Sequence, residues 1–232
     1  LAQCFAEALA SLLLVDLIKP SHPVIFGPWP FVTDLRTGSF SGGGGEEALL
    51  GAASAQITNY YGLISSVGAG MTDSKLPDAQ SGFEKGISVA MAALAGCNGI
   101  SESSGMLASL MGCSYESLVI DNEMLGVIMR TVKGIEVSDE TLSLEVIKEA
   151  VFGDGHFLRS GQTLEKMKSE YFYPEILDRK SQLEWREDGS LDIRKRAEIK
   201  VKQILENHSP LYIDKKADSL IRQNFPIQID FS

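Results

Sequence analysis

The sequence has few of the residues that form disulfides or metal centres. Its 232 residues include three cysteines and three histidines. The cysteines lie among apolar neighbours without CxxC spacing, which is typical of reduced core residues in an intracellular protein. No histidine has a second histidine or an acidic residue at metal-ligand spacing, so a structural role is favoured for each. The spacing of these six residues therefore predicts a chain without a metal site. They are Cys4, Cys97, Cys113, His22, His156 and His208.

Long hydrophobic runs and an excess of basic residues are also missing. The apolar run 8–15 lies between Glu7 and Asp16 and is too short to span a bilayer, and no signal-peptide pattern is present. Lys and Arg total 21 against 31 for Asp and Glu, and the resulting net charge of −10 repels nucleic acids and anionic membranes. The sequence therefore predicts a cytoplasmic protein that binds neither. It starts at Leu1 inside a helical pattern, so we expect a piece of a longer polypeptide.

Helical and strand patterns alternate in the first half of the chain. Residues 1–113 hold 13 charged side chains and residues 114–232 hold 39, so the first half is the expected buried scaffold. Successive βα units imply a parallel sheet, either doubly wound or closed into a barrel. The predicted helices cover residues 2–17, 46–61 and 77–95, and the predicted strands cover residues 23–26, 63–67 and 99–102.

The second half is predicted to be mainly helical and to pack on the first. Three strands are too few for an eight-stranded barrel, which needs roughly 200 residues or more. If the fold is a barrel, this chain holds only its last part. We therefore divide the chain into βα units (1–135) and a helical extension (136–232). The expected helices cover residues 115–132, 139–152, 163–170, 191–207 and 213–223.

The loop after the second predicted strand is the strongest candidate for a functional site. An apolar run ends there in glycines, passes through polar residues and enters a helix. Side chains at the carboxyl end of a strand are held rigidly yet can face a ligand. Met71, Asp73 and Lys75 are therefore candidate site residues. Lys75 and Asp73 could form an ion pair, remain solvated, or let Lys75 bind a substrate carboxylate.

Two glycine-containing segments resemble phosphate-binding loops only superficially. The SGGGG tract 41–45 precedes a predicted helix, but Glu46 and Glu47 follow at once and would repel a phosphate. A flexible active-site loop is the favoured interpretation. The segment GAGMTDSK has Ser74 where a Walker sequence needs glycine before its lysine, which excludes an ATP-binding loop.

Aromatic residues gather at predicted strand ends and loops. Such residues are most often part of a core, but aromatic faces can also hold a quaternary ammonium group through cation–π attraction. In the second interpretation Trp29 and Phe31 are the cage, and an acidic side chain supplies the opposite charge. The carboxylates placed to do so are Asp34, Asp73 and Glu102.

Three segments carry a specific family resemblance. They read GLISSVGAGMTDSKLPDAQSGFEKG (62–86), LVIDNEMLGVIMRTVKGIEVSDETL (118–142) and GDGHFLRSGQTLEKMKSEYFYPEILDR (153–179). Together, over about residues 1–207, they resemble the carboxyl-terminal half of the trimethylamine methyltransferase family. The resemblance implies a (β/α)8 TIM-type barrel, of which this chain is the last part, with a helical extension.

The resemblance also implies an activity. It is methyl transfer from a methylated amine to the Co(I) of a corrinoid (cobalamin) that a separate corrinoid protein carries. The enzyme would bind the amine and aim one N-methyl carbon at the cobalt. We expect the corrinoid protein as a partner, no tightly bound cofactor on this chain, and a homo-oligomer.

The sequence departs from the founding members of the family at one position of the site loop. Family enzymes that act on trimethylamine carry pyrrolysine where this sequence has Met71. The match is therefore to the branch without pyrrolysine, and a glycine betaine-like quaternary amine becomes the expected substrate. Several family members have histidine where this chain has Phe83, so no role for that histidine is carried over.

Two alternatives remain open at this point. The same scaffold could bind a quaternary amine or a corrinoid protein without turnover, because a fold does not fix an activity. Alternatively, Asp73 and Lys75 could carry out acid–base chemistry in a (β/α)8 enzyme that uses no corrinoid.

Overall fold

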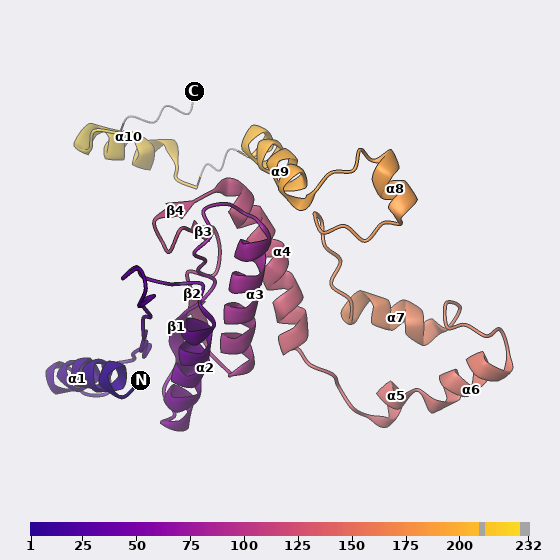
Figure 1. Cartoon of the computed structure of the whole chain (residues 1–232), viewed down its shortest axis with the longest axis horizontal. Coiled ribbons are helices and arrows are strands. Elements are labelled where there is room, and N and C mark those ends of the chain that lie inside the picture. Colours follow the sequence, from indigo (N-terminus) through magenta and orange to yellow (C-terminus); the bar gives the residue numbers. More distant parts are fainter. Residues whose placement is uncertain (209–211, 228–232) are drawn as a thin grey trace.

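The computed structural model describes residues 1–208 and 212–227, which form a helical protein around a small parallel sheet (Figure 1). In Figure 1, α2, α3 and α4 stand beside the strands, while α5 to α8 form an arm on one side. The helices are α1 (Ala2–Ile18), α2 (Gly45–Tyr60), α3 (Ala79–Leu94), α4 (Tyr115–Val132), α5 (Asp139–Leu142), α6 (Leu144–Phe152), α7 (Gly161–Ser169), α8 (Gln182–Glu187), α9 (Ile193–Asn207) and α10 (Lys215–Asn224).

The sheet is parallel and short. Strand β1 (Ser66–Gly68) pairs with β2 (Gly99–Ser101), with Val67 opposite Ile100. Phe26 adds a parallel bridge to Ser65 on the other side of β1. Each parallel crossover passes through a helix, α2 before β1 and α3 before β2. A separate antiparallel hairpin joins β3 (Met106–Leu107) to β4 (Gly112–Cys113).

Small side chains let α2 lie close to the sheet. Gly51, Ser54, Ala55 and Thr58 are buried along one face of this helix. A Cβ atom on Gly51 would lie only 3.8 Å from the Gly68 carbonyl oxygen, at the end of β1. This face closes the apolar core, whose buried members come from α2, β1, the loop after it, α3 and α4. They are Ala55, Val67, Ala69, Val89, Ala92 and Ile128.

A buried ion pair connects α3 to α4. Lys85 Nζ donates to Asp121 Oδ2 at 2.6 Å, and both side chains are almost completely buried. The same Asp121 oxygen accepts the Gly105 backbone N–H at 2.7 Å. Burial raises the pKa of Asp121, although the Lys85 ammonium and the Gly105 amide oppose that shift. The pair therefore joins both helices to the loop that follows β2.

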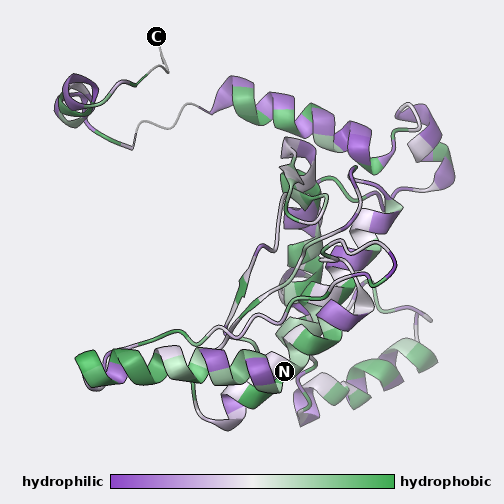
Figure 2. Cartoon of the chain, turned by 60° about the vertical axis from the view of Figure 1, so that its left-hand side comes forward, coloured by the Kyte–Doolittle hydropathy of each residue, from purple (hydrophilic) through white to green (hydrophobic). Residues whose placement is uncertain are grey.

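The helical second half is anchored to the first mainly through α4. Helix α9 packs on α4 and buries Ala197 and Val201. Arg130, on the last turn of α4, binds Glu170 through its side chain at 2.9 Å. At the other end of the chain, α1 is apolar along much of its length (Figure 2), and its exposed residues include Leu13 and Leu17.

Most predicted elements are present, with four corrections. Of the predicted strand 23–26, only Phe26 makes a bridge, and the strand predicted at 63–67 forms at 66–68, because the Leu63 N–H still bonds back to α2. The helix predicted at 139–152 is two helices, because Ser143 takes a left-handed conformation (φ +55°) between them. Helix α8 and the β3–β4 hairpin were not predicted. The parallel sheet and its helices fit part of an α/β domain.

Candidate functional site

The candidate loop begins where β1 ends. The Ala69 N–H donates to the Ser101 carbonyl at 3.1 Å, which extends the pairing of β1 with β2. Gly70 then turns the chain in the left-handed region (φ +90°), where its α-carbon lies against the Ser103 backbone. Met71 follows at the edge of the sheet where both parallel strands end, as predicted for a site residue.

The Met71 side chain is completely buried at this edge. A Cβ atom on Gly42 would lie 2.9 Å from Met71 Cβ and 3.4 Å from the Phe40 ring. On the other side, Gly68 is the close neighbour: a Cβ atom there would lie 3.6 Å from Met71 Cε and 3.4 Å from the Trp29 ring. The glycine tract thus covers Met71, and an apolar, aromatic environment surrounds its thioether.

Glu84 on α3 fixes the backbone that follows Met71. Its Oε2 atom accepts the Thr72 hydroxyl in a short hydrogen bond and the Asp73 backbone N–H at 2.9 Å. Its Oε1 atom accepts Gln80 Nε2 at 2.8 Å. Helix α3 therefore fixes the loop backbone in its position next to the sheet.

The Asp73 carboxylate connects three segments that are far apart in the sequence. Oδ2 accepts the Ser41 hydroxyl at 2.7 Å, and Oδ1 accepts the Gly42 N–H at 2.9 Å and the Ser109 hydroxyl at 2.6 Å. Burial alone would raise the pKa of Asp73, but the hydrogen bonds from Ser109, Ser41 and Gly42 outweigh it, and the pKa is lowered. Asp73 is therefore an ionised acceptor at neutral pH.

The tip of the β3–β4 hairpin reaches the same loop in an uncommon conformation. Ala108, Ser109 and Leu110 all have positive φ, at 50°, 54° and 72°. Left-handed backbone is unfavourable for residues with a Cβ atom by roughly 1–2 kcal/mol each. Two backbone hydrogen bonds of 2.8 Å hold the turn, from Ala108 N–H to the Ser74 carbonyl and from Ser109 N–H to the Thr72 carbonyl.

Two predicted charged site residues have local partners. The Lys75 ammonium is exposed and donates to the Asp73 backbone carbonyl at 2.7 Å, whereas the Asp73 carboxylate faces the other segments. Asp34 lies in a turn, where Arg36 Nη2 contacts it at 2.6 Å and lowers its pKa to about 2. Phe83 is exposed on α3. Lys75 and Asp34 are thus placed on the surface around the loop.

The predicted aromatic residues do come together. The rings of Trp29 and Phe31 meet edge to face with centroids 6.5 Å apart, and Phe31 meets Phe40 at 5.1 Å. Trp29 is half-buried against Gly68, while Phe31 is more exposed. Glu102 directly follows β2 with a left-handed backbone (φ +62°). Among the described residues, none hydrogen-bonds to its carboxylate or forms an ion pair with it.

Glu47, which lies on the buried face of α2, was not predicted as a site residue. This side chain is only 4% exposed, and its Oε2 atom has no hydrogen-bond partner among the described residues. Burial raises the pKa of Glu47 to about 7, although a hydrogen bond with the Val32 backbone opposes the shift. It lies one helical turn before Gly51, so it belongs to the strand-end layer. Its position in the first turn of a helix had suggested only a favourable dipole interaction.

We expect Glu47→Gln to stabilise the protein increasingly as the pH rises above about 4.5. In the unfolded chain the carboxyl has a pKa near 4.5, against about 7 when folded. The cost of ionising it grows as the pH rises from 4.5 to 7, and then stays constant. The variant should therefore be about 3 kcal/mol more stable than the wild type at pH 8 and about equally stable at pH 4. Urea unfolding at pH 4, 6 and 8 measures this difference.

Glu46→Gln is the matched control for this prediction. Glu46 is the exposed neighbour in the same helical turn, and its replacement should not give the gain in stability that Glu47→Gln gives at pH 8. If the unfolding free energies of Glu47→Gln and the wild type differ by the same amount at every pH, the Glu47 carboxyl does not titrate in this range.

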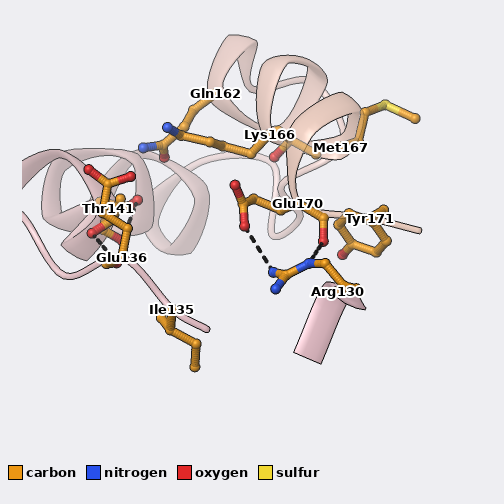
Figure 3. A pocket seen from close by; sticks show the side chains of 11 residues that line it. Arg130, Ile135, Glu136, Thr141, Gln162, Lys166, Met167, Glu170 and Tyr171 are labelled. Carbon is orange, nitrogen blue, oxygen red and sulfur yellow. Dashed lines mark hydrogen bonds and ion pairs between the residues drawn. The ribbon is translucent and has the colours of Figure 1, made fainter. Parts of the chain in front are cut away.

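A cavity of about 380 Å³ lies in the helical arm, apart from the Met71 loop (Figure 3). Residues from the end of α4, from α5 and from α7 line it. Three of its four charged lining residues have ion-pair partners: Arg130 binds Glu170 at 2.9 Å, and Lys166 binds Glu140 at 3.2 Å. We therefore interpret it as a groove between packed helices.

Neither a metal cluster nor a membrane span is found in the described ranges. Within residues 1–208 and 212–227, no three His, Cys, Asp or Glu side chains gather as they would around a metal ion. In the same ranges, every helix is too short or too polar to cross a bilayer.

Comparison with known proteins decides the family. The sequence profile described as trimethylamine methyltransferase (MTTB) matches residues 1–226. The chain belongs to the trimethylamine methyltransferase family. The match covers the strand-end loop, the α4 segment and most of the helical arm, which are the regions where the resemblance was seen.

Curated relatives in the trimethylamine methyltransferase family carry two kinds of name. A glycine betaine methyltransferase of Desulfitobacterium hafniense (strain Y51) is 36% identical over 217 residues, covering 94% of this chain and 45% of the relative. A trimethylamine methyltransferase of Methanosarcina thermophila is 37% identical over 212 residues, covering 90% of this chain and 43% of the relative. The chain thus spans a little under half the length of the relatives it matches.

Proposed function

We propose that the protein containing this chain is a corrinoid-dependent methyltransferase that moves a methyl group from a glycine betaine-like quaternary amine to the Co(I) of a corrinoid protein. The observation that supports it best is the residue at position 71. By the family resemblance, Met71 stands where family enzymes for trimethylamine carry pyrrolysine, and a relative of 36% identity is named a glycine betaine methyltransferase. In this proposal the chain is the last part of a (β/α)8 barrel, and it resides in the cytoplasm.

A quaternary amine suits the chemistry that the described residues offer. Its departing tertiary amine is neutral, so transfer needs no general acid at that moment. This fits a loop whose Asp73 is an ionised, hydrogen-bonded acceptor rather than a proton donor. The aromatic group of Trp29, Phe31 and Phe40 offers ring faces for N-methyl groups.

Charge complementarity assigns further roles. Glu102 follows β2 and has no ion-pair partner among the described residues, so we propose it as the carboxylate that faces the ammonium. Asp34 can supply additional negative charge, although Arg36 already offsets it. The exposed Lys75 ammonium at the rim is placed to attract the carboxylate of a betaine. In this proposal Met71 and Asp73 give the strand-end loop its shape.

The corrinoid belongs to a separate protein in this proposal. A corrinoid supplies a Co(I) nucleophile, and the role of this chain is to bind the amine and present one methyl group. The residues around Met71 suit that role, because they are apolar and aromatic side chains rather than metal ligands. We further propose that the enzyme is a homo-oligomer.

Incubating the full-length protein with cob(I)alamin and a panel of amines tests the proposal. The panel contains glycine betaine, other betaines, carnitine, choline and trimethylamine, and methylcob(III)alamin is followed by its absorbance. We expect transfer from one quaternary amine and none from trimethylamine. Binding of an amine without transfer from any of them would instead favour a non-catalytic binding protein.

A pair of variants tests the position of the ammonium site. Glu102→Gln should raise the KM for the quaternary amine by about tenfold, because the cation would lose the carboxylate that this proposal assigns to it. Glu165→Gln, on the exposed side of α7, is the matched control and should leave KM unchanged. An unchanged KM in Glu102→Gln would place the ammonium elsewhere.

A further inference from the structure

The Asp73 carboxylate is already occupied by groups of the protein. Its two oxygens accept three hydrogen bonds, from the Ser41 hydroxyl, the Gly42 N–H and the Ser109 hydroxyl, at 2.6–2.9 Å. A carboxylate has about four acceptor positions, so little capacity is left for a ligand. The three donors come from a glycine tract and from a hairpin tip, and both lie next to the loop that carries Met71.

The glycine tract is seated on the Met71 loop so closely that side chains would not fit. A Cβ atom on Gly42 would lie 2.9 Å from Met71 Cβ. A Cβ atom on Gly43 would overlap the Glu84 carboxylate and lie 2.9 Å from the Asp73 backbone nitrogen. Two of the four glycines are therefore explained by close approach of the backbone.

The position of this tract decides whether a ligand can reach Met71. With the tract in place, Met71 has no exposed surface, although it lies at the strand ends where a substrate is expected. No charged side chain other than Asp73 hydrogen-bonds to Ser41 or to the Gly42 backbone among the described residues. The attachment of the tract to the loop is thus concentrated in one carboxylate.

We propose that Asp73 is a positioning residue that holds the Ser41–Gly43 segment closed over Met71 and so controls access of the methylated amine to this position. The proposal rests on the proposed function for the identity of the ligand, but the closure itself does not. Asp73 acts through the tract and the hairpin tip, and it does not contact the amine. Release of the Ser41 and Gly42 hydrogen bonds opens the tract, while Glu84 keeps the loop backbone in place.

Oxidation of methionine by hydrogen peroxide measures this closure without any substrate. Peroxide converts an accessible thioether to a sulfoxide, and peptide mass spectrometry gives a rate for each methionine. Met111 and Met129, which are 87% and 65% exposed, serve as internal references. In full-length wild-type protein, Met71 should react much more slowly than either reference.

We expect Asp73→Ala to raise the oxidation rate of Met71 at least tenfold relative to Met111 and Met129. Asp73→Asn keeps an acceptor oxygen and should restore much of the protection. Asp34→Ala is the matched control: it removes a carboxylate that binds Arg36 within its own turn rather than Ser41, Gly42 or Ser109, and it should leave Met71 protected. An unchanged Met71 rate in a folded Asp73→Ala protein would overturn the proposal.

Two further measurements keep the test decisive. If Asp73→Ala does not fold, Ser109→Ala and Ser41→Ala each remove one hydrogen bond, and each should raise the Met71 rate by a smaller factor. In the methyl-transfer assay, a positioning role predicts that Asp73→Asn recovers most of the kcat lost in Asp73→Ala. A kcat lost in Asp73→Asn as fully as in Asp73→Ala, with Met71 protected in both, would mean that Asp73 acts on the substrate.

The oxidation experiment remains informative even if the proposed function fails. Faster Met71 oxidation in Asp73→Ala without any methyl transfer by the wild type would confirm the closure and reject the reaction. Methyl transfer by the wild type, with an unchanged Met71 oxidation rate in Asp73→Ala, would support the reaction and reject the closure.

Discussion

Replacing Lys85 with methionine is expected to lower the free energy of unfolding by about 3–5 kcal/mol. Lys85 is completely buried, and its ammonium lies 2.6 Å from Asp121, which is also buried. Methionine fills a similar volume but leaves the Asp121 carboxyl with the Gly105 N–H as its one hydrogen-bond partner among the described residues. Since burial already raises the pKa of Asp121, loss of the cation should raise it further. Equilibrium unfolding in urea at pH 7 measures the loss.

Two controls separate the buried pair from a general effect of lost charge. The double variant Lys85→Met with Asp121→Leu should recover most of the stability, because no unpaired charge then remains in the core. Arg159→Met breaks the exposed pair between Arg159 and Asp154 and should change stability by less than about 1 kcal/mol. An equal loss of unfolding free energy in Lys85→Met and Arg159→Met would contradict the assignment of a buried, coupled pair.

The second large effect is expected at the glycine that precedes Met71. Gly70 has φ +90°, and a Cβ atom there would lie 2.6 Å from Ser103 Cα and 3.0 Å from the Ser103 carbonyl carbon and oxygen. All three of these neighbours are backbone atoms, so relief requires β1 and the loop after β2 to separate. We expect Gly70→Ala to cost more than about 3 kcal/mol, measured by thermal or urea unfolding, and to expose Met71 to peroxide.

Gly82→Ala is the matched control for Gly70→Ala. Gly82 lies inside α3 with open space at its Cβ position, and alanine favours a helix over glycine by about 1 kcal/mol. The same substitution should therefore stabilise the protein at one position and destabilise it at the other. A mild effect at Gly70 would mean that the two strand ends can move apart at little cost.

Local patterns in the sequence predicted most of the helices and the loop that follows β1. Helix α4 was predicted with its observed bounds, since Ser114 caps its start and apolar residues recur along it. The loop at Met71 was predicted because glycines end an apolar run. The trimethylamine methyltransferase family, suggested by three segments, is confirmed by the family match.

Features that depend on distant segments were not predictable in this way. Asp73 was assigned to a ligand, but its partners are 32 and 36 residues away in the sequence, and no local pattern reveals them. The sequence also gives no sign that Glu47 and Lys85 are buried, because a charged residue on a helix is usually solvated. The assignments of Trp29, Phe31, Glu102 and Lys75 to a substrate stay predictions.

The left-handed turn at 108–110 has a consequence for engineering this site. Its three residues prefer a right-handed backbone, and the Ser74 and Thr72 carbonyls impose the opposite hand. Grafted into another scaffold without those two carbonyls, the same residues would relax, and the Ser109 hydroxyl would point elsewhere. A transplanted version of this site must therefore carry the loop and the hairpin together, since neither segment encodes the shape alone.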